Sequence, residues 1–542
     1  MPTPRASETW TSAASAAALG SGAATARPAS ASRNPIRPPR RAPSTRRQAT
    51  ASPRAVPTTS RGISCRSTKT RRGGRAGGSP LPGSIGTSSD FIFRAGIVAP
   101  TLDADPSGTT RTSLRRQAVE RVGVLIAGGG IIGSAIACAL VERGVNDVCV
   151  VDLDLAGMYA SSELNAGGVR ATWWCEPNVA SCRDTIAFFE AHADEVSLRQ
   201  RGYLWLYDDA AKFARARERR AFQERLGVRV DLLDPAEIAR RFPLLDRNLD
   251  QIAGATFSPR DGLVNPNAVR RLYRERACAG GARFLNRHYV EGVEVGEAEP
   301  GRRRVERVHV VEVQKGAPAD ESGLLRRILT QHRVEPEASL DHPSLRPEIF
   351  VNALGAWSPL LSARLGVRDW AVPVRRQIAM VDVRARDLPP GADLHGAGMI
   401  VDASGLYFHP EGPYTLAGFS SPAEPSGYEF RYDGEAFFEA ELWPRLAHRA
   451  SAFERCRHVR GWSGLYSVTP DCSGVLGQVP GFANAFEAHS FTGRGVMQSW
   501  AVGRGIAELI CDGRFGALDL APLAGERFLA GPDAFVKEDL HI

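Results

Sequence analysis

The 542-residue chain is poor in lysine and has no regular cysteine pattern. Lysine occurs only at positions 69, 212, 315 and 537, and we attribute the preference for arginine to GC-rich coding rather than to function. The nine cysteines form no Cys-x-x-Cys pair, which argues against a disulfide framework or a zinc site, so we predict no metal centre. Cysteines inside apolar runs are typical of buried thiols in a reducing compartment.

Acidic residues are scarce in residues 1–118. This segment holds 19 of the 68 Lys and Arg residues but only four Asp or Glu, so the remainder is net negative although the whole chain carries +8. It is also poor in large apolar side chains and rich in Ala, Ser, Pro, Gly and Arg. Such a segment buries too little apolar surface to offset the entropy of ordering, which predicts a disordered basic arm.

Three interpretations of this arm stay open. The composition suits a transit peptide, which would place the protein in the mitochondrial matrix, although the prolines disfavour an amphipathic helix. No methionine lies between Met1 and Met158, so a start near Val98 or Val119 is an alternative, and a cytoplasmic location is then expected. A nucleic-acid tail fits the charge, but no aromatic residues alternate with the basic ones, so we expect no nucleic-acid partner.

Residues 122–141 carry no charge and are long enough for a membrane span. Five glycines and the order of elements argue against that: a β-branched run, a glycine cluster, a small-residue helix and a second apolar strand ending at Asp152. Gly128, Gly130 and Gly133 stand in GxGxxG register, and Asp152 follows 19 residues after the last glycine. This pattern predicts a dinucleotide-binding βαβ unit, with phosphates at the helix N-terminus and Asp152 on the ribose, and no transmembrane segment.

Several downstream motifs indicate which dinucleotide binds. They are 161–170 (SSELNAGGVR), 261–266 (DGLVNP), 351–358 (VNALGAWS), 462–466 (WSGLY), 469–471 (TPD) and 491–497 (FTGRGVM). Together they resemble the FAD-dependent oxidoreductases of the D-amino-acid oxidase superfamily, which includes glycine oxidase, sarcosine oxidases and dimethylglycine dehydrogenases. The resemblance spans about residues 120–528. The ending at 519–522 and 527–528 is most similar to the FOXRED (FAD-dependent oxidoreductase domain-containing) branch.

The resemblance implies an α/β fold over residues 119–542. We expect a Rossmann-like FAD-binding domain of three layers (ββα), interleaved with a smaller α+β substrate domain built on an antiparallel sheet. The FAD-binding parts are expected at about 119–200, 260–300, 345–370 and 462–528, and the substrate domain at about 201–259 and 371–461. Residues 315–345 are polar and are expected to form an insertion.

The same resemblance implies a set of FAD-binding residues. Val290 would contact the adenine through its backbone, Gly355 would lie beside the pyrophosphate, and the turn at 493–497 would present N–H groups to the flavin. Asn165 replaces the histidine that tethers FAD in some relatives, so we expect non-covalent FAD. The predicted cofactor residues are Gly128, Gly130, Ile131, Ile132, Gly133, Asp152, Ser161, Ser162, Asn165, Ala166, Gly167, Gly168, Val290, Gly355, Trp357, Gly493, Arg494, Gly495, Val496 and Met497.

Four residues are candidates for the substrate side. A carboxylate clamp calls for arginine, whose planar fork makes two hydrogen bonds. Arg170 matches an active-site arginine of sarcosine oxidases, and Arg494 lies in the flavin turn. Tyr407 and His409 alternate along one strand and would face the substrate together, whereas residues 375–377 are expected to order the domain junction. For each of the four, a purely structural role is the alternative.

The predicted activity is oxidation of the C–N bond of a small amino acid or N-methylated amino acid, by hydride transfer to flavin N5. The strand at 415–418 lacks the lysine that sarcosine oxidases use with oxygen, which favours a dehydrogenase over an oxidase. The electron acceptor stays open among oxygen, a quinone and an electron-transfer flavoprotein. Two alternatives remain: a 2-hydroxy-acid dehydrogenase, and a flavoprotein assembly factor for a respiratory complex.

Overall fold

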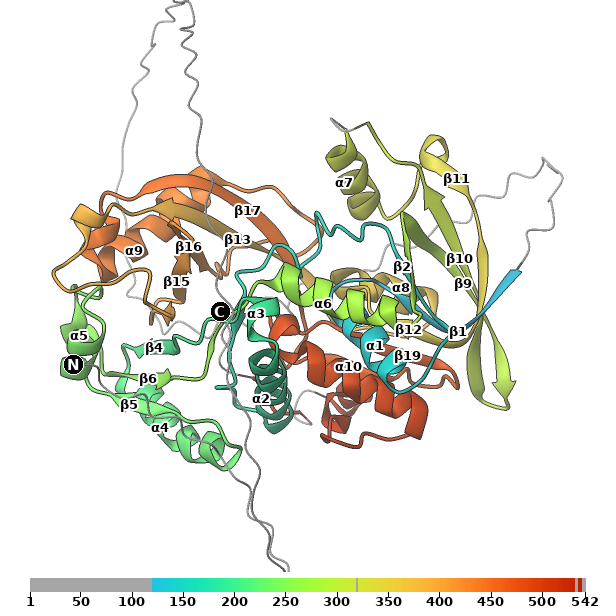
Figure 1. The fold of residues 1–542 in the computed structure, drawn as a ribbon, viewed down its shortest axis with the longest axis horizontal. Coiled ribbons are helices and arrows are strands. Elements are labelled where there is room, and N and C mark those ends of the chain that lie inside the picture. The colour runs from blue at the N-terminus through green and yellow to red at the C-terminus, as the bar shows by residue number, and fades with distance from the viewer. Residues whose placement is uncertain (1–118, 318–319, 532–534, 539–542) are drawn as a thin grey trace, which may run out of the picture. The chain divides into compact units, whose positions relative to one another are not determined.

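The structure is a computed structural model that describes residues 119–317, 320–531 and 535–538 (Figure 1). The arm predicted over residues 1–118 lies outside the described residues. Two large sheets, of nine and eight strands, organise the described part of the chain, and a two-stranded sheet joins β3 (Gly168–Val169) to β7 (Gly262–Leu263).

The nine-stranded sheet begins with the predicted βαβ unit. Strand β1 (Val119–Ala127) pairs in parallel with β2 (Val148–Asp152) and with β12 (Ser344–Asn352), and β12 pairs in parallel with β19 (Ala485–His489). The carboxyl ends of these four strands therefore meet at one edge, where open α/β sheets bind their ligands. The other strands are β8 (Arg283–Asn286), β9 (His288–Glu299), β10 (Arg302–Val313), β11 (Ser339–Asp341) and β18 (Val475–Gln478).

Alternating residues of β1 bury their side chains in two different cores. Ile126 faces a layer of helices, while Leu125 faces the ribbon of β9 and β10 on the other side, because successive strand residues point to opposite faces. The helical layer contains α1 (Ile131–Glu142), α2 (Glu176–Ala191), α6 (Pro266–Ala279) and α10 (Gly495–Asp512). The predicted ββα arrangement of three layers is therefore confirmed (Figure 1).

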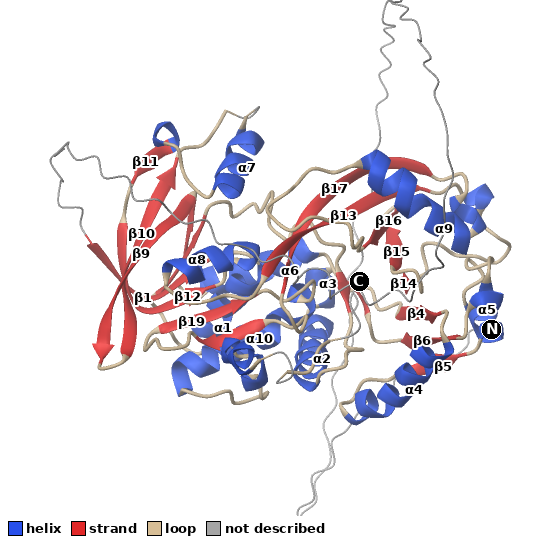
Figure 2. Cartoon of the chain, turned by 180° about the vertical axis from the view of Figure 1, so that it is seen from behind, coloured by secondary structure: helices blue, strands red, loops and turns tan. Residues whose placement is uncertain are grey.

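The eight-stranded sheet is mainly antiparallel, as predicted (Figure 2). Its one parallel pair joins β4 to β14. The longest strand, β17, continues past residue 461 and pairs with β13 over its whole length. In order across the sheet the strands are β17 (Arg457–Val468), β13 (Val372–Asp382), β16 (Tyr414–Phe419), β15 (Leu406–Glu411), β14 (Met399–Val401), β4 (Tyr203–Tyr207), β6 (Gly254–Ser258) and β5 (Asp231–Leu233).

The remaining helices lie mostly around this second sheet. Helix α5 (Pro235–Arg241) begins with a strong start signal: Asp234 caps the N-terminus, Pro235 takes the first position and Glu237 completes a capping box. In the insertion at 315–345, helix α7 buries Leu324 and Leu325 beside the first sheet. The helices not yet named are α3 (Ala193–Val196), α4 (Ala210–Arg225), α5 (Pro235–Arg241), α7 (Glu321–Gln331), α8 (Ser358–Arg364), the π-helix η5 (Gly434–Leu442) and α9 (Trp443–Arg449).

The apolar run at 122–141 is divided between β1 and α1, as the βαβ interpretation requires. Within the described ranges, no helix combines the length and the apolar character needed to cross a bilayer.

Candidate active site

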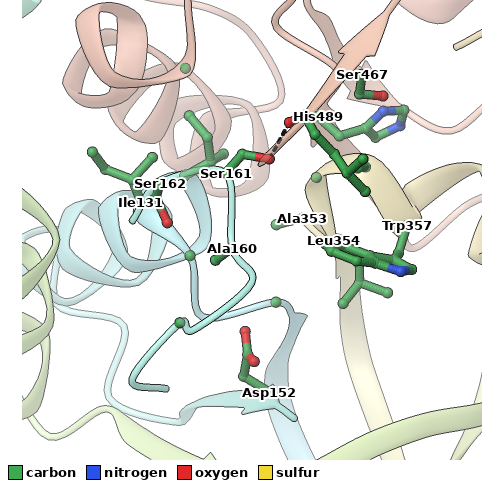
Figure 3. A pocket seen from close by; sticks show the side chains of 18 of the residues that line it. Ile131, Asp152, Ala160, Ser161, Ser162, Ala353, Leu354, Trp357, Ser467 and His489 are labelled. Atoms are coloured by element: carbon green, nitrogen blue, oxygen red, sulfur yellow. Dashed lines mark hydrogen bonds between the residues drawn. The ribbon is translucent and has the colours of Figure 1, made fainter. Parts of the chain in front are cut away.

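A long cavity opens at the carboxyl edge of the first sheet. We call it the first cavity; its volume is about 220 Å³. Figure 3 shows Asp152 and Ser467 at well-separated points of its wall, with Ser162 close to Ile131. Of the predicted cofactor residues, those that line it are Gly128, Gly130, Ile131, Ile132, Asp152, Ser161, Ser162, Asn165, Val290, Gly355, Trp357, Gly493, Gly495 and Val496.

The glycine turn is held against Asp152. Gly129 N–H donates to Asp152 Oδ2 at 2.6 Å, and Asp154 N–H donates to the other carboxylate oxygen at 2.8 Å. Burial raises the pKa of Asp152 despite these donors. Gly133 does not line the cavity. A Cβ there would overlap the carbonyl oxygen of Gly128, so this glycine allows the helix to pack on the turn.

Polar groups on the cavity wall fit a pyrophosphate. The Ser162 hydroxyl is buried and has no hydrogen-bond partner among the described residues. Helix α1 has no side-chain cap at its N-terminus, so its first N–H groups remain available for phosphate oxygens. A Cβ placed on Gly355 would meet nothing within 4 Å, so the wall there is open. The residues present therefore fit a dinucleotide along the first cavity.

A smaller cavity, the second cavity, adjoins the flavin end predicted for the first. Its volume is about 50 Å³. The two cavities share the wall residues Asn165, Tyr466, Thr492, Gly493 and Val496, so they are contiguous. The second cavity is further lined by Ala166, Gly167, Gly168, Arg170, Tyr203, Met399, Tyr407 and Met497.

Arg170 lies in an aromatic cage on the wall of the second cavity. Its guanidinium carbon is 4.2 Å from the ring centroid of Trp173, 4.9 Å from that of Trp205 and 5.4 Å from that of Tyr203. Its Nε is buried without a hydrogen-bond partner. The cage fixes the direction of the side chain and leaves donor capacity for a ligand.

Asp261 positions the segment that carries Arg170. Strands β3 and β7 pair directly beside it, and Asp261 accepts from Ala171 N–H at 3.1 Å and from the Thr172 hydroxyl at 3.4 Å. Burial raises the pKa of Asp261 to about 7. The predicted motif at 261–266 thus contributes through the backbone next to Arg170.

Three tyrosines of the second cavity each occupy space left by a glycine. A Cβ on Gly168 would collide with the Tyr203 hydroxyl, and one on Gly418 with Tyr407. A Cβ on Gly493 would come within 2.6 Å of the ring of Tyr466. The sequence analysis assigned no role to Tyr203 or Tyr466. The feature that could have identified them is an aromatic residue in a strand, close to a glycine.

Two predicted substrate residues do not reach either cavity. The Arg494 side chain is 1% exposed and packs with its guanidinium carbon 4.5 Å from the ring centroid of Trp173. His409 shares the face of Tyr407 but is buried, and its Nδ1 is 3.1 Å from the Pro410 carbonyl oxygen. Neither side chain is placed to contact a ligand in the second cavity.

A buried histidine that the sequence did not single out lines the first cavity. His489 Nδ1 is 2.8 Å from the Ser490 hydroxyl, which lies 2.7 Å from the hydroxyl of Ser467 (Figure 3). Burial lowers the pKa of His489, but the carboxylates of Asp369 and Glu487 outweigh it, so the pKa is raised overall. This network places a polar group on an otherwise largely apolar wall.

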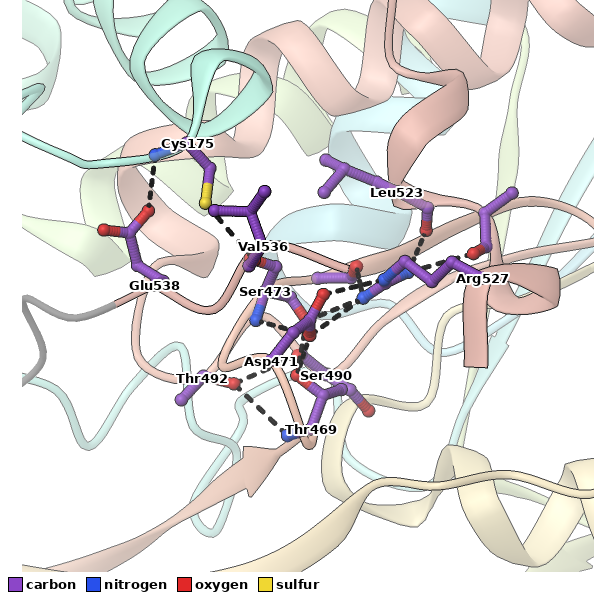
Figure 4. Close-up of polar contacts among 12 residues, drawn as sticks. Cys175, Thr469, Asp471, Ser473, Ser490, Thr492, Leu523, Arg527, Val536 and Glu538 are labelled. Atoms are coloured by element: carbon purple, nitrogen blue, oxygen red, sulfur yellow. Dashed lines mark hydrogen bonds and ion pairs between the residues drawn. The ribbon is translucent and has the colours of Figure 1, made fainter. Parts of the chain in front are cut away.

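The loop at 469–473 and the C-terminal segment support the turn before α10 (Figure 4). Asp471 accepts from the Thr469 hydroxyl at 3.0 Å and forms an ion pair with Arg527 at 2.8 Å. Thr469 N–H in turn points at the Thr492 hydroxyl at 3.5 Å. Glu538 accepts from Trp174 N–H at 2.8 Å, next to the aromatic cage of Arg170. These contacts join the C-terminal segment to the loop at 469–473 and to the residues next to Arg170.

Comparison with known proteins identifies the family. The family model for "DAO: FAD dependent oxidoreductase" matches residues 123–509. The chain belongs to the DAO family of FAD-dependent oxidoreductases. FAD is therefore the dinucleotide that the first cavity fits, and the protein is an enzyme of this oxidoreductase family.

Several individual proteins are also similar to this chain over most of its length. FAD-dependent oxidoreductase domain-containing protein 1 of Bos taurus is 29% identical over 77% of this chain and 86% of its own length. Glycine oxidase of Geobacillus kaustophilus is 25% identical over 76% of this chain and 98% of its own. The crystal structure of L-proline dehydrogenase from P. horikoshii has a TM-score of 0.63 at 22% identity, covering 78% of this chain and 100% of its own, which shows a shared fold.

Proposed function

We propose that this DAO-family enzyme oxidises the C–N bond of a small amino acid or N-methylated amino acid, using non-covalent FAD. The observation that carries the proposal is Arg170, a caged guanidinium with a free donor on the wall of a small cavity contiguous with the FAD cavity. The names of similar proteins, glycine oxidase and L-proline dehydrogenase, agree with an amino-acid substrate.

Residues of the chain would bind the substrate and orient it. Arg170 would hold the substrate carboxylate, and the tyrosine walls would exclude water and fix the substrate against the wall that both cavities share. FAD bound along the first cavity would supply the hydride acceptor that oxidation of the substrate carbon needs. No Asp or Glu of the described residues lines the second cavity, so the amine would bind in its neutral form, from which hydride departure is favourable.

Asn165 supports non-covalent binding. Its side-chain nitrogen donates to the Ser162 carbonyl at 2.8 Å, and its oxygen accepts from Gly167 N–H at 2.8 Å. An amide so engaged is not a nucleophile, and no cysteine of the described residues lines either cavity. Release of all flavin on acid precipitation would bear this out, and retention of colour in the pellet would contradict it.

A 2-hydroxy-acid dehydrogenase is the second candidate, because an arginine clamp serves a hydroxy acid equally well. The deciding experiment mixes FAD-loaded protein anaerobically with sarcosine, dimethylglycine, proline, glycine and 2-hydroxyglutarate and follows flavin bleaching. We expect bleaching by an amine substrate. Bleaching by the hydroxy acid alone would favour the second candidate, and a protein that holds FAD but bleaches with none would favour an assembly role. Slow recovery of colour in air would indicate a dehydrogenase with another acceptor, such as a quinone or an electron-transfer flavoprotein.

Arg170→Met tests the clamp. We expect the substrate concentration for half-maximal bleaching to rise by about a hundredfold or more, since one bidentate charge-assisted pair is lost. Arg271→Met on the exposed face of α6 is the matched control, because Arg271 is 58% exposed and distant from both cavity walls. Equal behaviour of the two variants would assign Arg170 a structural role only.

A further inference from the structure

Three hydrogen-bonding side chains lead from the wall of the first cavity into the protein interior. The Ser467 hydroxyl oxygen lies 2.7 Å from that of Ser490, which lies 2.8 Å from Nδ1 of His489. All three residues line the first cavity, and Figure 3 shows Ser467 beside His489. Their exposed fractions fall from 7% at Ser467 to 2% at Ser490 and 1% at His489, which places Ser467 at the cavity end. We call these three residues the hydrogen-bond chain.

The second ring nitrogen of His489 faces two buried carboxylates. Nε2 is 3.4 Å from Glu487 Oε2 and 3.6 Å from Asp369 Oδ2, and both acidic side chains are at most 7% exposed. Asp369 is held in place by the Ser362 hydroxyl at 3.2 Å and by Ala371 N–H at 2.9 Å. Nε2 therefore carries a hydrogen, since otherwise its lone pair would face carboxylate oxygens.

The same carboxylates favour the cationic form of the ring. Burial lowers the pKa of His489, but the charges of Asp369 and Glu487 raise it by more. A further charged neighbour, Arg527, opposes them, although its own guanidinium is paired with Asp471 at 2.8 Å. His489 is thus a buried cation next to the wall of the first cavity.

The charge of His489 decides the direction of the two hydroxyl groups. In the cationic ring Nδ1 carries a hydrogen and donates to Ser490, so Ser490 donates to Ser467, and the Ser467 hydrogen is left to point into the cavity. In a neutral ring with its hydrogen on Nε2, Nδ1 accepts from Ser490 and Ser490 accepts from Ser467. The hydrogen-bond chain therefore ends in a donor only when His489 is charged.

This donor lies near the predicted flavin end of the first cavity. Tyr466, which precedes Ser467, and Thr492, two residues after Ser490, belong to the wall that both cavities share. A hydride consists of one proton and two electrons, so its transfer would leave one additional negative charge on the cofactor. A hydrogen-bond donor fixed beside that charge stabilises the reduced form more than the oxidised form.

We propose that His489, acting through Ser490, makes Ser467 a hydrogen-bond donor to FAD in the first cavity and so makes the cofactor easier to reduce. Ser467 is the residue that touches FAD, and His489 is a positioning residue, because its charge sets the direction of the hydroxyl groups. No proton leaves the ring. The inference concerns the cofactor alone and goes beyond the proposed function, since it holds for any substrate that reduces FAD.

The test measures the midpoint potential of bound FAD without any substrate. FAD-loaded full-length protein is reduced at pH 7 with dithionite together with a dye of known potential, and both absorption spectra are followed. His489→Gln removes the charge and keeps a polar side chain. We expect it to weaken binding of reduced FAD relative to oxidised FAD at least about tenfold, which lowers the potential by about 30 mV for a two-electron couple.

His409→Gln is the matched control, because His409 is an equally buried histidine that lines neither cavity. Its potential should equal that of wild type. A potential in His489→Gln that is the same as in wild type and His409→Gln would overturn the proposal.

Ser467 variants test whether the effect passes through the hydroxyl groups. Ser467→Ala should lower the potential, and Ser467→Thr, which keeps the hydroxyl, should restore most of it. Adding His489→Gln to Ser467→Ala should change the potential little, because the connection is already broken. An equal effect of His489→Gln in both backgrounds would overturn the proposal, since it would show a charge effect that does not need the hydrogen-bond chain.

Folding of each variant is checked by FAD content and far-ultraviolet circular dichroism. If His489→Gln does not fold, the comparison of Ser467→Ala with Ser467→Thr decides, and equal potentials in these two variants would overturn the proposal. The outcome is separable from that of the proposed function. Potentials that shift as expected in a protein that no amine bleaches would support the inference and reject the proposed chemistry, and bleaching by an amine with unshifted potentials would do the reverse.

Discussion

The buried side chain of His409 should make the stability of the folded protein depend on pH. Burial lowers the pKa of His409 to about 4. Between pH 6.5 and 4 the unfolded chain binds a proton that the folded chain does not, so stability is lost as the pH falls through this window. From pH 7.5 to pH 5 the loss should be about 2 kcal/mol, from 1.36 kcal/mol per pKa unit.

Chemical unfolding at the two pH values measures this loss in wild type and in His409→Gln. We expect the variant to lose about 2 kcal/mol less than wild type over the interval, whatever its stability at pH 7.5. His395→Gln, at an exposed position, should lose as much as wild type. A variant at position 409 with an unchanged pH difference would contradict the assignment.

At the residue scale, the sequence predicted some roles and left others open for a physical reason. Arg170 follows a recognisable motif, which predicted a place near the cofactor-binding residues, and its side chain lines the second cavity. Arg375 and Arg376 are adjacent and chemically identical, and only the phase of strand β13 decides which one is paired with Glu424 and which lies beside the ring of Tyr466. Arg494 belongs to the predicted flavin turn, yet its side chain packs in the core against Trp173.

At the element scale, two glycines of the turn between β1 and α1 should respond differently to alanine. A Cβ on Gly133 would overlap the Gly128 carbonyl, so Gly133→Ala should destabilise the protein even without FAD. A Cβ on Gly130 has only the Ser162 hydroxyl nearby, at 3.7 Å, so Gly130→Ala should fold normally but lose FAD affinity by tenfold or more, roughly, because the methyl group faces the pyrophosphate.

Thermal unfolding of the FAD-free variants and fluorescence titration with FAD separate the two effects. Loss of FAD affinity in Gly130→Ala at unchanged apo stability is the decisive result. Equal apo stability of wild type and Gly133→Ala would contradict the packing role of Gly133.

Local elements were the most predictable level of structure. The first βαβ unit followed from a pattern confined to residues 122–152. The placement of β19 beside β12 does not, because it joins residues more than 130 positions apart and depends on pairing that no local pattern records. The wall that β19 supplies, with His489, was therefore found only in the structure.

At the scale of the whole molecule, FAD should act as a structural component. The first cavity is lined by strands of both large sheets, including β2 and β17, so bound FAD would contact both at once. A ligand that binds only the folded state stabilises it by about 2.7 kcal/mol at a hundred times its Kd. The midpoint of thermal unfolding should therefore rise with FAD concentration, and Gly130→Ala should show little rise at the same concentrations. A midpoint independent of FAD would contradict this.

Strand β17 sets a limit on how the protein can be re-engineered. The strand pairs with β13 along its length, while its last residues, Leu465, Tyr466 and Ser467, form part of the FAD cavity wall. The eight-stranded sheet therefore cannot be exchanged on its own, because grafting it from a relative would also import part of the FAD cavity wall. A chimera should place its junction after residue 468, with Thr492 and Gly493 carried from the same parent, so that the turn continues to match the strand it touches.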